Sequence, residues 1–173
     1  MQAGVACMGI LILPSCHLCL DIVMAIHLEH STVARCTPEL IWQHFSQIDL
    51  WPATVPKVIG QAAWTEGQPW QKGSKFSMKL LQPMPMYAKP EVIECNAPTS
   101  VHWIAPGSGV TQKQWFTFEP QPDGTTKMTA RMEFDGPMTF MFGQSIQTQI
   151  LNMYTEWMDA LRTQAEASAQ GSV

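Results

Sequence analysis

The sequence predicts an α+β domain in which a curved antiparallel sheet of seven strands wraps around one long C-terminal helix, with two short helices after the first strand. Two patterns support this fold class. Apolar residues within residues 139–167 recur in steps of four and three, the spacing of one helix face. Upstream, turn residues recur about every ten positions between segments of alternating polarity, as in an antiparallel meander.

The predicted C-terminal helix over residues 139–167 determines what the rest of the chain must do. Its apolar stripe consists of Phe142, Ile146, Ile150, Met153, Trp157 and Leu161. At 1.5 Å per residue such a helix would be roughly 40 Å long. A helix with so broad an apolar face needs another layer to cover it, and the upstream strands can supply that layer.

The two short helices are predicted from local start signals. A first strand over residues 25–33 is followed by residues 37–39 (TPE), which offer an N-cap hydroxyl, a proline at N1 and an acid in the first turn. A second short helical turn is expected to begin at Asp49 and to end before Pro56. Both helices should therefore lie between the first strand and the meander.

Six further strands are expected after these helices. They cover residues 57–65, 75–81, 88–95, 100–105, 111–119 and 126–135. In the strands 75–81 and 126–135 apolar and polar residues alternate cleanly, which assigns one face of each to the interior. The first, second and fourth strands alternate less cleanly, and a register shift of one residue there would exchange their faces.

Residues 1–23 are predicted to be an N-terminal extension, residues 24–168 one domain, and residues 169–173 a disordered tail. We favour a translation start at Met24, because a coherent strand follows it. The alternative is a leader, since residues 13–16 (LPSC) resemble a lipoprotein cleavage box, although no Lys or Arg precedes Arg35. Residues 16–19 (CHLC) have CxxC spacing, but no second pair follows to complete a zinc site.

Composition narrows the class of protein. The chain has 173 residues, of which 46% are hydrophobic and 14% charged, so it can bury a substantial core. A net charge of -4 with ten unclustered Lys and Arg residues argues against nucleic-acid binding. We expect no metal, no cofactor and no stable membrane span, and the oligomeric state stays open. Five scattered cysteines favour the reducing cytoplasm, and the alternative is a lipoprotein or an exported protein if residues 1–23 are a leader.

A cavity is expected between the sheet and the long helix, because a twisted sheet diverges from a straight rod. Twelve Met and seven Trp residues are suited to line an adaptable cavity, although they could equally form an ordinary packed core. We predict a volume of roughly 300 Å³ or more. The predicted wall consists of Phe76, Met78, Trp103, Gln114, Phe116, Met128, Met132, Ile150, Met153, Tyr154 and Trp157.

Five short segments, taken in order, carry a family resemblance. They are residues 37–42 (TPELIW), 49–52 (DLWP), 73–76 (GSKF), 97–103 (APTSVHW) and 123–125 (DGT). With these segments the chain from about Met24 to Ala167 resembles the START-like, Bet v 1-like (SRPBCC) superfamily, in its polyketide cyclase/dehydrase and lipid-transport branch. The resemblance implies a helix-grip fold that binds a hydrophobic small molecule such as a lipid, sterol, quinone or aromatic polyketide. It does not settle catalysis, because carriers, sensors and enzymes share the scaffold.

Two functions from different classes follow, and we favour the first. The first is a carrier or sensor that binds a hydrophobic small molecule such as a lipid, quinone or aromatic polyketide. The second is a cyclase- or dehydratase-type enzyme acting on a polyketide-like or aromatic substrate, for which His30 and Tyr154 are weak catalytic candidates. His102, Glu133 and Asp135 are expected to face outward. An interaction domain of the chaperone-activator kind is a third alternative, which a filled core would favour.

Overall fold

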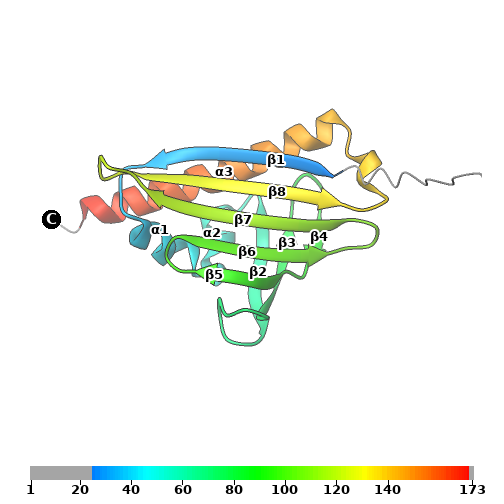
Figure 1. Cartoon of the computed structure of the whole chain (residues 1–173), viewed down its shortest axis with the longest axis horizontal. Helices are drawn as coiled ribbons and strands as arrows, with labels where there is room; N and C mark the ends of the chain where they lie inside the picture. Colours follow the sequence, from blue (N-terminus) through cyan, green and yellow to red (C-terminus); the bar gives the residue numbers. More distant parts are fainter. Residues whose placement is uncertain (1–24, 172–173) are drawn as a thin grey trace, which may run out of the picture.

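The structure is a computed structural model that describes residues 25–171, so the hypotheses on residues 1–23 lie outside the described residues (Figure 1). The strands are β1 (Ile26–Ala34), β2 (Ile59–Glu66), β3 (Lys75–Leu80), β4 (Met86–Ala88), β5 (Glu91–Asn96), β6 (Ser100–Pro106), β7 (Thr111–Pro120) and β8 (Thr126–Asp135). The helices are α1 (Pro38–Phe45), η1 (Ile48–Leu50), α2 (Trp51–Thr54), η2 (Thr139–Met141) and α3 (Gln144–Gln170).

The strands form a single antiparallel sheet around the long helix. Their order is β1-β8-β7-β6-β5-β3-β2, and β4 adds to β3 beside this path. Helix α3 lies on one face of the sheet, and α1 and α2 cover that same side at the end where α3 finishes (Figure 1). The predicted fold class, a curved antiparallel sheet around a long C-terminal helix with short helices after the first strand, is confirmed.

The sheet contains one more strand than predicted, because the expected strand 88–95 is divided in two. β4 ends at Ala88 and pairs with β3, whereas β5 begins at Glu91 and pairs with β6. Pro90 lies at the break, and a proline has no N–H to donate to a sheet ladder. Its carbonyl still accepts a hydrogen bond from the backbone N–H of Phe76 at 3.1 Å.

The long helix begins later than predicted, at Gln144 instead of residue 139. Residues 139–141 form the separate turn η2, and Gly143 takes the N-cap position of α3. Phe142 has φ -84° and ψ 68°, which lies outside the helical region. Its ring still packs on Phe134, with 5.4 Å between the centroids, so the apolar stripe continues across the break in the helix.

Hydrogen bonds attach the C-terminal end of α3 to the segment that runs from the end of β1 through α1. The backbone N–H of Arg35 donates to Glu166 Oε1 at 2.8 Å, and His44 Nε2 lies 2.9 Å from Ser168 Oγ. The helix continues to Gln170, and Ala169 packs against the core. Residues 169 and 170 therefore extend the helix into the segment predicted as a tail, because Ala169 still has apolar surface to bury.

Aromatic side chains fill the interior next to α1 and α2. The centroid of the Phe45 ring lies between 4.9 and 6.5 Å from those of seven other rings, namely Trp42, Trp51, Trp70, Trp103, Phe116, Phe118 and Trp157. The indole N–H of Trp51 donates to the carbonyl of Phe45, and that of Trp70 to the carbonyl of Ser46. Both buried polar atoms are therefore satisfied. We call this set of eight rings the aromatic cluster.

At the opposite end, two loops meet through glycine. The backbone N–H of Met138 donates to the carbonyl of Gly109 at 3.0 Å. Gly136 has φ +132°, and a Cβ built on it would lie 2.4 Å from the carbonyl oxygen of Gly109. A side chain at residue 136 would therefore meet both an unfavourable backbone conformation and a backbone atom.

We expect Gly136→Ala to lower the free energy of unfolding by roughly 1–3 kcal/mol, because it strains this contact between the loops. Chemical denaturation followed by circular dichroism measures the loss. Gly124→Ala is the matched control, since residue 124 also has a positive φ of +82° but a Cβ there would have no neighbour within 4 Å. Equal losses in the two variants would show that the contact between Gly109 and Gly136 does not constrain the loops.

Candidate functional site

A cavity of about 340 Å³ lies between the sheet and the N-terminal half of α3. The helix contributes Ile146, Ile150, Met153 and Tyr154 to its wall, and the strands contribute Leu80, Ala88, Ala105, Gln112 and Phe134. Side chains of this kind suit an apolar ligand, and the volume falls within the range of small-molecule sites. The cavity therefore has the predicted size, but it occupies only the end of the interior away from the aromatic cluster.

Small side chains explain why the cavity opens at this end. Trp103 and Ala105 lie two residues apart on the inner face of β6, and both are buried. Trp103 belongs to the aromatic cluster and fills the space between the sheet and the helix. Ala105 reaches a much shorter distance inward, as does Ala88 on β4, so the space in front of them stays open.

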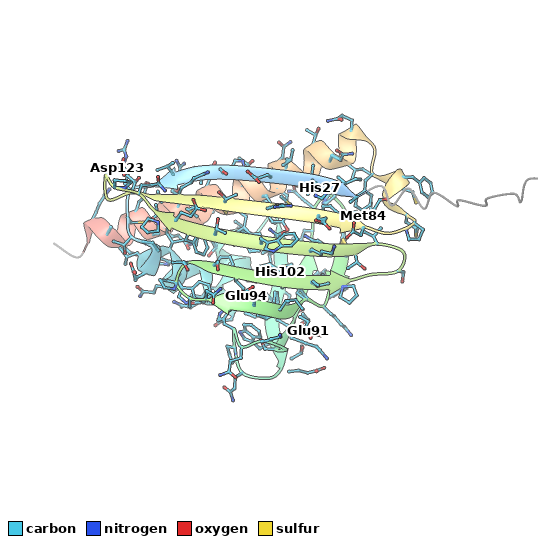
Figure 2. All side chains as sticks on the ribbon, viewed as in Figure 1. His27, Met84, Glu91, Glu94, His102 and Asp123 are labelled. Atoms are coloured by element: carbon cyan, nitrogen blue, oxygen red, sulfur yellow. The ribbon has the colours of Figure 1, made fainter. Side chains whose placement is uncertain are left out.

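Two apolar segments contribute large side chains to the mouth of the cavity, beside the loop between β6 and β7. One precedes and includes β4, the other connects β8 to α3, and together they contribute Pro83, Met84, Met86, Tyr87, Met138, Met141 and Phe142 to its lining. Met84, Met86, Tyr87, Met138 and Met141 are large apolar side chains that are nevertheless exposed. Figure 2 shows Met84 at the same end of the sheet as the start of β1. Exposed apolar surface of this kind marks binding sites, and Met side chains adapt to different shapes.

The inner wall carries a connected set of polar side chains. Gln112 Nε2 donates to the hydroxyl oxygen of Tyr154 at 2.9 Å and to Gln114 Oε1 at 3.2 Å. Gln114 Nε2 donates in turn to the backbone carbonyls of Arg131 and Trp115. Burial raises the pKa of Tyr154 above its ordinary value, the hydrogen bond from Gln112 opposing this in part. Tyr154 therefore keeps its proton at neutral pH.

The predicted wall overlaps this cavity in three residues only. Ile150, Met153 and Tyr154 line it. The other predicted wall residues are buried without lining it, and they are Phe76, Met78, Trp103, Gln114, Phe116, Met128, Met132 and Trp157. Most of these residues face the middle of the sheet or the region beside α1, where they pack against one another. Their inward orientation was predictable, whereas their close packing against one another was not.

His30 lies on the inner face of β1 and faces α3, but it does not line the cavity. Its Nδ1 lies 3.3 Å from Thr155 Oγ1. Its Nε2 is buried and has no hydrogen-bond partner among residues 25–171. The two catalytic candidates are thus separated in space: Tyr154 is at the cavity, and His30 sits between β1 and α3.

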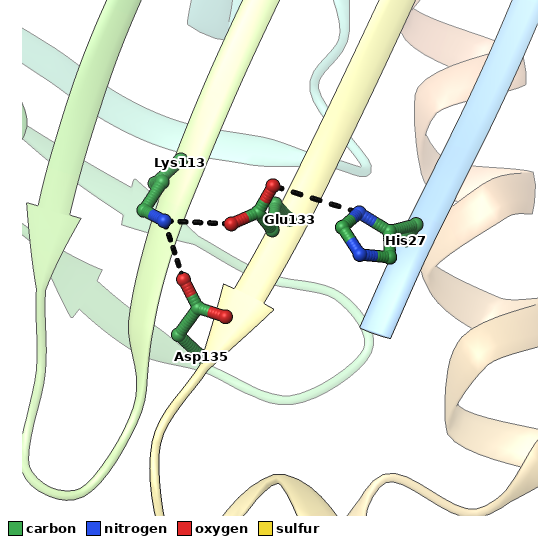
Figure 3. A network of polar contacts seen from close by, with 4 residues as sticks. All are labelled: His27, Lys113, Glu133 and Asp135. Carbon is green, nitrogen blue, oxygen red and sulfur yellow. Dashed lines mark hydrogen bonds and ion pairs between the residues drawn. The ribbon is translucent and has the colours of Figure 1, made fainter. Parts of the chain in front are cut away.

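Charged side chains lie on the outer face of the sheet. Lys113 Nζ is 2.6 Å from Glu133 Oε1 and 2.5 Å from Asp135 Oδ2, and His27 Nδ1 is 3.5 Å from Glu133 Oε2 (Figure 3). The hydrogen bond from Lys113 lowers the pKa of Asp135. The hydrogen bond to Asp135, and to a smaller extent the one to Glu133, raises the pKa of Lys113. Glu133 and Asp135 thus face outward as expected.

His102 also lies on the outer face, as its alternation with Trp103 predicts (Figure 2). Its ring stacks on Trp115, with 4.4 Å between centroids and 12° between planes. Desolvation by burial lowers the pKa of His102, which favours its neutral form.

Sequence reasoning missed most of the cavity lining, for two reasons. Gln112 and Phe134 lie within the predicted strands 111–119 and 126–135 and alternate in step with Gln114 and Met132, but the predicted wall did not include them. The residues of the mouth belong to loops, where no periodicity assigns a face. Their only signal is composition, since Met and Pro residues alternate in the segment 83–86 (PMPM).

A curved antiparallel sheet that holds a long helix, with an apolar cavity between them, defines a helix-grip protein of the ligand-cavity class. A family model described as polyketide cyclase/dehydrase and lipid transport matches residues 25–166. The chain belongs to this family, and with it to the SRPBCC, or Bet v 1-like, superfamily. The family and the fold indicate binding of hydrophobic small molecules. No curated protein matches the sequence.

Solved structures with the same fold come from plants and bacteria. Major latex-like protein 151 of Panax ginseng is 13% identical, with a TM-score of 0.66 over 80% of this chain and 96% of its own. Truncated norcoclaurine synthase of Thalictrum flavum is 13% identical, with a TM-score of 0.63 over 81% and 92%. The protein TTHA0849 of Thermus thermophilus is 8% identical, with a TM-score of 0.69 over 83% and 99%. At such identities the likeness is one of fold alone.

Two other kinds of feature are absent from the described part of the chain. No helix within residues 25–171 is both long and apolar enough to cross a membrane. Within the same residues, no three side chains of His, Cys, Asp or Glu come together as a metal-binding group would require.

The raised pKa of Tyr154 predicts a loss of stability at alkaline pH. Between about pH 9 and pH 11 the unfolded chain releases this proton while the folded chain retains it, which lowers the free energy of unfolding by about 1.4 kcal/mol. Tyr154→Phe should remove this contribution, so the variant should lose less stability than the wild type. Met153→Leu, a neighbouring change without a titratable group, should keep the wild-type slope. Equal slopes in wild type and Tyr154→Phe would mean that Tyr154 ionises in the folded protein.

Proposed function

We propose that this protein binds a hydrophobic small molecule, such as a lipid, quinone or aromatic polyketide, as a carrier or sensor. The observation that carries the proposal is the cavity itself. About 340 Å³ of space lies behind an exposed apolar mouth, and its lining in the described chain contains no Lys, Arg, His, Asp or Glu. Transfer of an apolar ligand from water into such a space is favourable by about 25 cal/mol per Å² of buried apolar surface.

The mouth supports ligand exchange. Met84, Met86, Met138 and Met141 are unbranched and flexible, and they lie on two connecting segments at the end of the sheet. Such a mouth can adapt to the ligand and can open without breaking the long strand ladders. The aromatic cluster at the other end gives the scaffold the rigidity that a preformed cavity needs.

The cavity offers less to the enzymatic alternative. Proton transfer needs a donor and an acceptor that can both reach the substrate. Tyr154 lines the cavity, but His30, the second candidate, contacts Thr155 outside the cavity lining. The described lining supplies no carboxylate or imidazole in its place. We therefore favour binding over cyclase or dehydratase chemistry.

For location, we propose the cytoplasm. Cys36 and Cys95 are free thiols. Burial raises the pKa of both thiols, and nearby Glu166 raises that of Cys36 further. A raised pKa keeps a thiol protonated and unreactive, which suits a protein of a reducing compartment.

The test of the binding proposal is to fill the cavity. Ala105→Phe adds a ring to the inner wall, whereas Ala63→Phe adds the same ring to an exposed position on β2. We expect Ala105→Phe to weaken binding of the neutral fluorescent probe N-phenylnaphthylamine at least about tenfold, a change of about 1.4 kcal/mol. Ala63→Phe should bind the probe as the wild type does.

The same three proteins should be extracted with organic solvent and analysed by mass spectrometry for co-purified small molecules. A compound present in wild type and Ala63→Phe but lost in Ala105→Phe would identify the natural ligand class. If all three proteins bind the probe equally, the ligand does not enter the cavity. If none binds it, the carrier and sensor proposal is wrong.

A further inference from the structure

The polar side chains at the cavity have defined orientations, because the backbone dictates them. Carbonyl oxygens only accept hydrogen bonds, so Gln114 must present its NH₂ group to the carbonyls of Arg131 at 3.1 Å and Trp115 at 3.2 Å. Its Oε1 then faces Gln112, which must present its own NH₂ group. The two N–H bonds of Gln112 are thereby used on Gln114 Oε1 and on the hydroxyl oxygen of Tyr154. This relay leaves Gln112 Oε1 free to accept.

Tyr154 is left with a free donor. Its hydroxyl oxygen already accepts from Gln112, and its proton has no acceptor among residues 25–171. The side chain is 2% exposed, so bulk water has little access to it. Tyr154 and Gln112 both line the cavity. The inner wall therefore offers one hydrogen-bond donor and one acceptor side by side, in surroundings that are otherwise mostly apolar.

The cavity lacks a partner for a charged ligand. The described lining has no cationic side chain, and the ion pairs of Lys113 with Glu133 and Asp135 lie on the outer face of the sheet. A carboxylate taken into this space would lose its hydration without gaining a counter-charge, and such a loss weakens binding strongly. The polar end of the ligand should therefore be neutral.

We propose that the ligand is a neutral molecule with a hydroxyl group, an alcohol or a phenol, at the inner end of an apolar body. This inference rests on the proposed binding function. The hydroxyl accepts from Tyr154 and donates to Gln112 Oε1, so both free groups of the wall are satisfied. A ketone or quinone carbonyl satisfies Tyr154 only and leaves the Gln112 oxygen unpaired. A hydrocarbon satisfies neither group, and a carboxylate is excluded by its charge.

The experiment compares four compounds of similar size on the full chain at neutral pH. They are para-butylphenol, valerophenone, butylbenzene and para-butylbenzoate, each titrated against bound N-phenylnaphthylamine. We expect para-butylphenol to bind about tenfold more tightly than butylbenzene, because it forms two hydrogen bonds with the wall that butylbenzene cannot form. Valerophenone should fall between the two, and para-butylbenzoate should bind more weakly than any of them.

Two variants test whether the preference for para-butylphenol depends on Tyr154 and Gln112 in the inner wall. In the double variant Tyr154→Phe with Gln112→Met, the preference for para-butylphenol over butylbenzene should fall to about twofold or less, while butylbenzene keeps its affinity. Gln61→Met is the matched control, because it makes the same amide-to-thioether change at an exposed position on β2, outside the cavity lining. It should leave the preference unchanged. Circular dichroism verifies that each variant is folded. If the double variant does not fold, the ranking of the four compounds on the wild type still tests the inference.

The outcomes separate the two proposals. Displacement of the probe by all four compounds with equal affinity, or a preference for para-butylbenzoate, would overturn the hydroxyl inference and leave the binding function intact. A preference for para-butylphenol that the double variant retains would also overturn it, because the selectivity would then arise elsewhere. If neither the probe nor any compound binds, both proposals are wrong.

Discussion

The packing of aromatic rings around Phe45 is the constraint on which the rest of the structure depends. Rings from α1, α2, the sheet and α3 meet there, and their combined size sets how closely the helix can approach the sheet. Interiors are close packed, so the helix cannot come nearer at that end. Farther along the same helix the sheet presents Ala88 and Ala105, which are too small to fill the separation. The same separation between α3 and the sheet is thus filled by aromatic rings at one end and left open as the cavity at the other.

The order of elements could be predicted from the sequence because it depends on local patterns. Alternation in β3 and β8 assigned their inner faces, and the N-cap, proline and acid of residues 37–39 located α1. The position of the cavity depends on something else. Trp103 and Ala105 both face inward, and alternation treats them alike. Whether an inward position is packed or leaves space depends on the side chains that α1, α2 and α3 place opposite it. No local sequence pattern contains that information.

The errors at element boundaries have a related cause. Apolar spacing alone carried the predicted helix back to residue 139, because Phe142 has the right position in the stripe. The stripe indicates which side chains are buried, and Phe142 is indeed packed on Phe134. It does not indicate backbone conformation, which changes at Gly143. The strand predicted over residues 88–95 likewise continued through Pro90, because side-chain pattern does not indicate where the backbone leaves the ladder.

The separation of charge from the cavity bears on what the site can do. The charged groups of β7 and β8 pair with one another on the outer face, and the polar side chains on the inner wall of the cavity, Gln112 and Tyr154, are an amide and a phenol. An amide does not take up a proton at neutral pH, and a phenol whose pKa is raised by burial is a weaker acid than usual. Both groups are instead fixed in direction by the carbonyls of Arg131 and Trp115 through Gln114. Polar groups that are oriented but do not exchange protons can recognise a ligand and hold it in one direction.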